Sequence, residues 1–93
     1  MNKKLLKLRN EINNVDQKII LLIFRRLTIV KKIARLKKKN HLSIIDNIRE
    51  KEIVIQIMQQ AQSKKINKSF IVKLFRLIIN ESKERQKEIM YEK

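Results

Sequence analysis

The sequence predicts an all-α fold with three helices, on the strength of two observations. The chain has 93 residues and contains no Gly and no Pro, the residues that usually mark the tight turns of a β-rich fold. Its apolar residues also recur at alternating steps of three and four, which is the period of a helix with one buried face. A chain of this length makes one domain, which we place at residues 1–93.

The first helix is expected from about residue 3 to about residue 39. At ~1.5 Å per residue it would be roughly 55 Å long, which exceeds the width of a globule of this size. We therefore expect a second copy of the chain to pack along it, giving an intertwined homodimeric helical bundle. The apolar seam for that contact is formed by Leu5, Leu8, Ile12, Val15, Ile19, Leu22, Ile29, Ile33 and Leu36.

Two shorter helices are expected after the first, at about residues 45–62 and 68–91. Ser43 stands three residues before Asp46, a weak capping-box pattern at the start of the second helix. Asn67 or Ser69 is expected to cap the third helix, since both residue types accept hydrogen bonds from the free N–H groups of a first turn.

Polar residues interrupt the inward face of each predicted helix. Arg26 occupies the seam position between Leu22 and Ile29, where an unpaired buried charge would cost several kcal/mol. In the second helix, the face continued by Ile53 and Ile57 opens with Asp46, Arg49 and Glu50, and in the third, the face begun by Ile71 and Phe75 carries Ser82 and Gln86. Polar groups on three inward faces predict a lined pocket inside a helical bundle.

Helix geometry relates the cations of the first helix to one another. Arg26 and Lys37 are eleven residues apart, close to three full turns, so they share a face with their α-carbons ~16 Å apart along the axis. Both side chains could converge on an anion between them. Arg9 lies ~25 Å from Arg26 on the same helix, so it could join that site only from an antiparallel second copy.

Composition limits the kinds of partner and chemistry. The formal net charge is +15, from 24 Lys and Arg against 9 Asp and Glu. That balance favours anionic partners such as nucleic acid, an acidic membrane surface or a small polyanion, although a solvated basic surface explains many of the charges equally well. With no Cys and one His, no metal site or cofactor is expected. The longest apolar run, Ile19 to Phe24, is far shorter than the roughly 20 residues of a membrane span, and a cytoplasmic protein is expected.

The chain contains the run Leu8-Arg9-Asn10-Glu11-Ile12, then Val15-Asp16, Arg25-Arg26, Lys37, Asp46, Arg49-Glu50, Phe75-Arg76-Leu77-Ile78-Ile79, Ser82 and Gln86. In these residues it resembles the all-helical chorismate mutases, and most of all the mutase domain at the N-terminus of bifunctional chorismate mutase–prephenate dehydratases. The resemblance covers nearly the whole chain without an evident gap. One departure is Ser43, which stands in the first connection where several relatives have proline.

The resemblance implies a substrate, a product and an assembly. Chorismate would rearrange to prephenate, a step in phenylalanine and tyrosine biosynthesis, in two equivalent sites that are each built from both chains of a homodimer. Arg26 and the partner's Arg9 would hold the two carboxylates of the substrate, with Ser82 beside one of them. The rearrangement is intramolecular, so it requires no nucleophile, metal or cofactor.

The remaining site residues receive their roles from the same resemblance. Lys37 and Gln86 would donate hydrogen bonds to the ether oxygen of the substrate. Glu50 would accept one from the ring hydroxyl, with Asp46 near it. Arg49 would shape the site, partly through its backbone. Lys37, Gln86, Arg26 and Glu50 are thus the expected catalytic residues.

Three alternatives remain open at this stage. An isochorismate pyruvate lyase would share the fold and the cationic pocket, although Asp46, Arg49 and Glu50 together favour the mutase. A basic helical nucleic-acid-binding protein would suit the charge, but the chain has few aromatic residues and its Lys residues are not confined to one recognition helix. A structural coiled-coil dimer would leave Arg26 without a purpose, and Arg26→Leu should then stabilise it.

Overall fold

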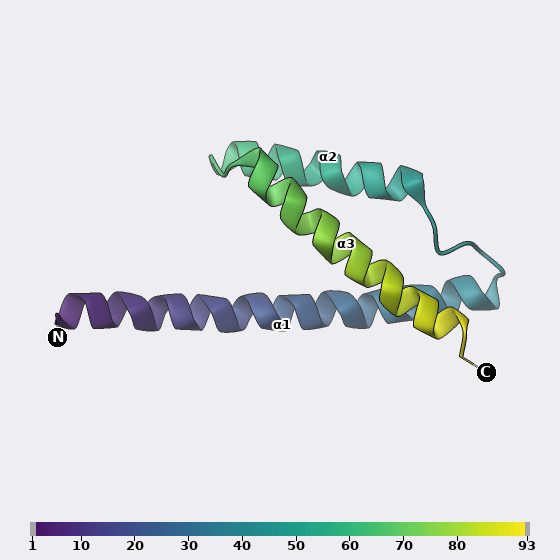
Figure 1. Ribbon diagram of the computed structural model, residues 1–93, viewed down its shortest axis with the longest axis horizontal. Coiled ribbons are helices and arrows are strands. Elements are labelled where there is room, and N and C mark those ends of the chain that lie inside the picture. Colours follow the sequence, from purple (N-terminus) through teal and green to yellow (C-terminus); the bar gives the residue numbers. More distant parts are fainter. Residues whose placement is uncertain (1, 93) are drawn as a thin grey trace.

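The protein is a flat assembly of three helices. The computed structural model describes residues 2–92, which form α1 (Lys3–Lys39), α2 (Asn47–Ser63) and α3 (Lys68–Met90) and contain no strand. In Figure 1, α1 runs the length of the molecule, and α3 crosses from the end of α2 to the C-terminal part of α1. The overall extents are 57 × 30 × 14 Å, so the thinnest direction is little more than one helix diameter. The prediction of an all-helical chain with three helices is confirmed.

Each helix begins at an Asn or Asp side chain that accepts from the free N–H groups of the first turn. The Oδ1 atom of Asn2 accepts from the Lys4 N–H at 2.9 Å, and Asn67 accepts from the Phe70 N–H at 2.9 Å. Asp46 is the N-cap of α2, so this helix starts two residues later than expected. The predicted capping role of Ser43 is wrong, because its hydroxyl accepts from the Ile45 N–H inside the connection instead.

Both connections turn without glycine. His41 and Lys65, each just past a helix end, have φ of 55° and 56°, in the left-handed region that costs a residue with a Cβ roughly 1–2 kcal/mol. The following N–H groups reach back to the helix, from Leu42 to the Lys37 carbonyl and from Ile66 to the Ala61 carbonyl, both at 2.8 Å. This is the Schellman arrangement, and it compensates part of the backbone cost by satisfying helix-end carbonyls.

The buried core within residues 2–92 is small. Its apolar members are Val30, Ala34, Ala61, Ile79 and Ile89, and they lie where α3 packs on α1 and on α2. In contrast, every residue from 3 to 25 is exposed. The nine apolar residues of the α1 seam are all exposed, from 42% for Ile33 to 60% for Ile12. Because α3 covers a different stripe of α1, the predicted seam is left uncovered by the chain's own helices.

The exposed helix α1 does not have the apolar composition of a membrane span. Within residues 2–92, no helix is both long enough and apolar enough to cross a bilayer.

Candidate active site

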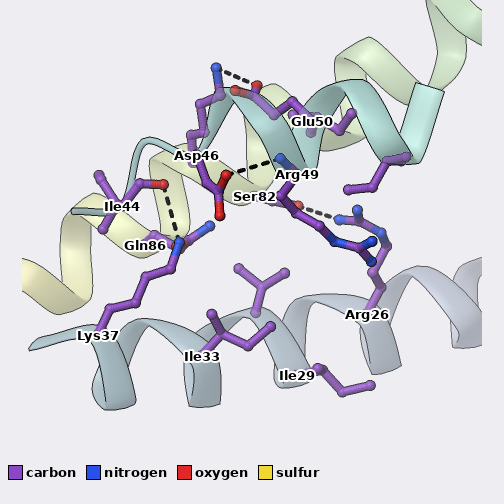
Figure 2. A pocket seen from close by; sticks show the side chains of 14 residues that line it. Arg26, Ile29, Ile33, Lys37, Ile44, Asp46, Arg49, Glu50, Ser82 and Gln86 are labelled. Atoms are coloured by element: carbon purple, nitrogen blue, oxygen red, sulfur yellow. Dashed lines mark hydrogen bonds and ion pairs between the residues drawn. The ribbon is translucent and has the colours of Figure 1, made fainter. Parts of the chain in front are cut away.

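A cavity of about 240 Å³ opens where the three helices approach one another. Its lining includes seven of the eight residues that the sequence singled out for the site. Figure 2 shows Arg26 and Lys37 rising from α1 toward the residues of α2 and α3. The complete lining is Arg26, Ile29, Val30, Ile33, Lys37, Ile44, Asp46, Arg49, Glu50, Ile53, Ile79, Ser82, Lys83 and Gln86.

Arg26 is held at one end of the cavity by a neutral partner. Its Nη1 donates to the Ser82 hydroxyl oxygen at 2.5 Å, and that hydroxyl donates to the Ile78 carbonyl at 2.8 Å. Ser82 is only 5% exposed, as its predicted inward position requires. Burial lowers the pKa of Arg26 from its ordinary value, and the positive charge of Arg49 lowers it further. An arginine remains charged under these conditions, so an anion between the two guanidinium groups would relieve their repulsion.

Lys37 lies at the other end of the cavity, again among neutral groups. Its Nζ donates to the Ile44 carbonyl at 3.3 Å and to Gln86 Oε1 at 3.4 Å. Both contacts are long for an ammonium donor, and a third N–H remains for a ligand. Because Gln86 presents its oxygen to Lys37, its amide NH₂ is free to donate elsewhere. Gln86 is buried, at 9% exposed.

The first turn of α2 supplies the upper wall. Asp46 Oδ1 accepts from the Arg49 N–H at 2.9 Å, which caps the helix and places the Asp46 carboxylate over the cavity (Figure 2). The Arg49 side chain extends toward Arg26 in the same view. Its ion pair with Glu52, at 3.3 Å, joins two side chains that are each more than half exposed, so this pair is weak and Arg49 can turn to a ligand.

Glu50 is paired across the cavity wall with a residue that the sequence analysis missed. Its Oε1 lies 2.7 Å from the Nζ of Lys83, and Lys83 belongs to the cavity lining. A signal for Lys83 was present, because it follows Ile79 by four residues and precedes Gln86 by three. A charged residue on an inward helical face is the same observation that pointed to Arg26.

The charge and polarity of the cavity favour an anionic ligand. Its lining has four cations and two carboxylates, set among the apolar side chains of Ile29, Ile33 and Ile53. Low-polarity walls strengthen the interaction of these cations with a bound anion. Within residues 2–92, no group of three or more His, Cys, Asp or Glu side chains is arranged to hold a metal ion.

Arg9 is the one predicted site residue that the single chain does not bring to the cavity. It lies on the exposed N-terminal part of α1, ~25 Å along the helix from Arg26. The contribution of Arg9 from a second copy therefore remains a prediction.

Comparison with known proteins identifies the family of the chain. The family described as chorismate mutase type II matches residues 8–87, a span that contains every residue of the cavity. The chain belongs to this family, as the resemblance predicted.

Individual relatives include both fused and separate proteins. The chain is 38% identical over 89 residues, 96% of its length, to the bifunctional chorismate mutase/prephenate dehydratase of Buchnera aphidicola subsp. Acyrthosiphon pisum, and covers 23% of that protein. It is 30% identical over 92 residues, 99% of its length, to the chorismate mutase of Methanocaldococcus jannaschii, and covers 93% of it. The chain thus spans about a quarter of the length of the bifunctional Buchnera relatives.

Proposed function

We propose that this protein is a chorismate mutase that converts chorismate to prephenate in phenylalanine and tyrosine biosynthesis, in the cytoplasm, with residues 1–93 acting as one mutase domain. The observation that carries the proposal is the pair of α1 cations in the cavity. Arg26 and Lys37 both point into it, and their hydrogen-bond partners are neutral. Their charge is therefore available to a ligand with two carboxylates.

Substrate binding begins with Arg26. Its guanidinium, already oriented by the buried Ser82 hydroxyl, would form a charge-assisted pair with one carboxylate of chorismate. Arg49 lies near enough to lower the pKa of Arg26, so the same carboxylate would gain from both cations. The Asp46 cap that fixes the first turn of α2 holds the Arg49 backbone in place.

Lys37 and Gln86 would act on the bond that breaks. In the rearrangement the ether C–O bond breaks as a new C–C bond forms within the same molecule, and negative charge grows on the ether oxygen. The free N–H of Lys37 and the amide NH₂ of Gln86 are donors set in advance for that oxygen. Removing one such donor typically costs ~2.7–4 kcal/mol of barrier stabilisation.

The remaining contribution is orientation. The flexible substrate must adopt a compact chair-like conformer, and holding that conformer reduces the entropic cost of reaction. Glu50 would accept from the ring hydroxyl, with Asp46 nearby, while Ile29, Ile33 and Ile53 enclose the apolar carbons. With Ser82 and Gln86 of α3, the contacts come from three helices, so any substrate bound in the cavity would be held from several sides.

The active form would be a homodimer in which the partner's Arg9 completes each site. Two facts support this proposal. Every residue of the apolar seam of α1 is exposed in the single chain, and exposed contiguous apolar surface of this extent is typical of an interaction site. The N-terminal part of α1 also has no cover from α2 or α3, so a second copy running antiparallel can lie along it.

The decisive experiment follows the absorbance of chorismate after addition of the purified protein, beside an Arg26→Ala variant at equal folded concentration. Rapid decay with prephenate as product is expected for the wild type only. The variant should lose at least about 100-fold in kcat/KM, as for other preplaced charge contacts. A folded wild-type dimer that leaves chorismate unchanged would overturn the proposal, and isochorismate and then DNA would be tested next.

The pH profile provides a second test. The Gln86 amide has no titratable proton in this range, and the single histidine, His41, is absent from the cavity lining. The lowered pKa of Arg26 means that folding disfavours its charged form. That effect is relieved only in the alkaline range, as pH rises through the folded pKa. We expect turnover to be flat between about pH 5 and 8, and a steep loss there with intact helicity would contradict the donor assignment.

A further inference from the structure

Lys83 has a contact that the proposed mechanism does not use. It projects from α3 into the cavity wall and pairs with Glu50 at 2.7 Å, with the two side chains 32% and 25% exposed respectively. The dashed line beside Glu50 in Figure 2 marks this ion pair. Within residues 2–92, Lys83 is the only hydrogen-bonding or ion-pairing partner of the Glu50 carboxylate.

The other cations of the cavity have different partners. Arg26 and Lys37 contact neutral oxygens, and Arg49 pairs with Glu52, which does not line the cavity. Lys83 is therefore the lining cation whose charge is directed to a carboxylate of the same cavity. The main effect of the Lys83–Glu50 ion pair is therefore to fix the position of the Glu50 carboxylate, and its effect on substrate attraction is smaller.

Glu50 needs such a restraint because of its neighbours. The cavity also contains Arg26, Arg49 and Lys37, and an unrestrained carboxylate would be drawn toward them. A Glu50 side chain that turned to Arg26 would neutralise the cation proposed to bind a substrate carboxylate. It would also leave the position from which it can accept the ring hydroxyl.

We propose that Lys83 is a positioning residue that holds the Glu50 carboxylate against α3, ready for the substrate hydroxyl and away from Arg26. This inference rests on the proposed mutase function. It assigns Lys83 an effect that acts only through Glu50, and that dependence can be measured with a double-mutant cycle.

The cycle compares the wild type, Lys83→Met, Glu50→Gln and the double variant with chorismate as substrate. Lys83→Met keeps a long side chain on the helix while it removes the charge. We expect it to lower kcat/KM roughly threefold to tenfold, mainly in kcat, within the range of coupling between contacting residues. In the Glu50→Gln background, Lys83→Met should cause no further loss of kcat/KM. The single variant Lys83→Arg, which keeps the charge, should retain most of the wild-type activity.

Lys87→Met is the matched control, because Lys87 lies one turn further along α3 and pairs with Glu84 at the surface. It should retain wild-type kinetics. Equal activity of Lys83→Met and wild type would overturn the inference. So would a loss that persists in the Glu50→Gln background as a higher KM, since Lys83 would then attract the substrate directly. A wild type without activity would instead refute the proposed function itself.

Discussion

The two halves of α1 differ sharply although they belong to one continuous helix. From Lys3 to Arg25 every residue is exposed, and none of these residues lines the cavity of the candidate active site. From Arg26 to Lys39 the helix includes buried Val30 and Ala34 and contributes Arg26 and Lys37, two of the four cations of the cavity. The apolar seam runs through both halves with the same spacing, so the pattern of the sequence does not distinguish them.

The difference between the halves comes from α3, which packs only on the C-terminal part of α1 (Figure 1). A molecule 14 Å thick has no second layer to cover the rest. In the proposed dimer the N-terminal half would cover a partner and contribute Arg9 to the partner's site. The two halves would then be two parts of one functional unit, supplied by different chains.

The largest expected effect on activity comes from two separate variants, each of which removes one cation from one half of α1. Lys37→Met should lower kcat about 10²–10³-fold, the usual cost of losing a preplaced donor. Arg9→Met should cause a comparable loss in kcat/KM, although Arg9 is far from the cavity of its own chain. Steady-state kinetics on chorismate would measure both, with circular dichroism at 222 nm to show that helicity is retained.

Mixing these two inactive variants tests whether the halves act in trans. After joint unfolding and refolding at equal amounts, half of the dimers are mixed, and one of the two sites in each mixed dimer keeps both cations. About a quarter of the wild-type activity should therefore return, as the symmetry of a two-fold dimer requires. No recovery from mixed dimers would mean that Arg9 does not complete the partner's site.

A smaller effect is expected from a charge placed in the exposed seam. Ile12→Lys puts an ammonium at a position that is 60% exposed in the single chain but would face the partner in the dimer. We expect the variant to sediment as a monomer at micromolar concentration and to lose most of its activity, with partial recovery at higher protein concentration.

The matched control for that variant is Gln17→Lys, which adds the same charge on the opposite side of α1. It should remain dimeric and active, because it does not touch the seam. An Ile12→Lys variant that behaves like Gln17→Lys would show that the N-terminal half remains uncovered in solution.

The smallest effects are expected at the two ends of α1. Asn2→Ala removes the cap bonds to Lys4 and Leu5, a loss of ~0.5–2 kcal/mol. If the N-terminal half is covered in the dimer, this loss should lower the free energy of global unfolding measured with urea. If the helix end is bare, the loss would appear only as faster local amide exchange.

At the other end, His41→Gly relieves a positive φ and should stabilise the protein by up to ~1 kcal/mol. The control Asn40→Gly, at φ −96°, should not.

Much of the fold followed from simple patterns. The absence of Gly and Pro and the three-and-four spacing predicted three helices, and the observed bounds lie within about two residues of those expected. Asp46 shows where the pattern was insufficient. Ser43 and Asp46 are both good N-cap residues, and only their contacts in the folded chain distinguish them. Asp46 accepts from the Arg49 N–H of the first turn, whereas Ser43 accepts from the Ile45 N–H of the connection.

The cavity was predictable to a similar degree. Arg26, Ser82 and Gln86 were visible because each interrupts an apolar helical face, and the structure places all three on one cavity. Helix geometry placed Lys37 on the same face as Arg26, the inward face of the second helix pointed to Asp46, Arg49 and Glu50, and the resemblance to a family assigned their roles. Lys83 also lies on an inward helical face, but in a chain with 24 Lys and Arg its role became visible only through its distance to Glu50.

The sequence alone therefore determined the helices, their approximate ends and the inward direction of the polar residues, because these depend on neighbours within one or two turns. The tertiary structure decided which stripe of α1 meets α3, which polar groups converge and which acid pairs with Lys83. Those outcomes depend on the angle at which α3 crosses α1, and that angle is set by packing between residues about 50 positions apart, such as Arg26 and Ser82 or Lys37 and Gln86. Local periodicity contains no information about such distant contacts.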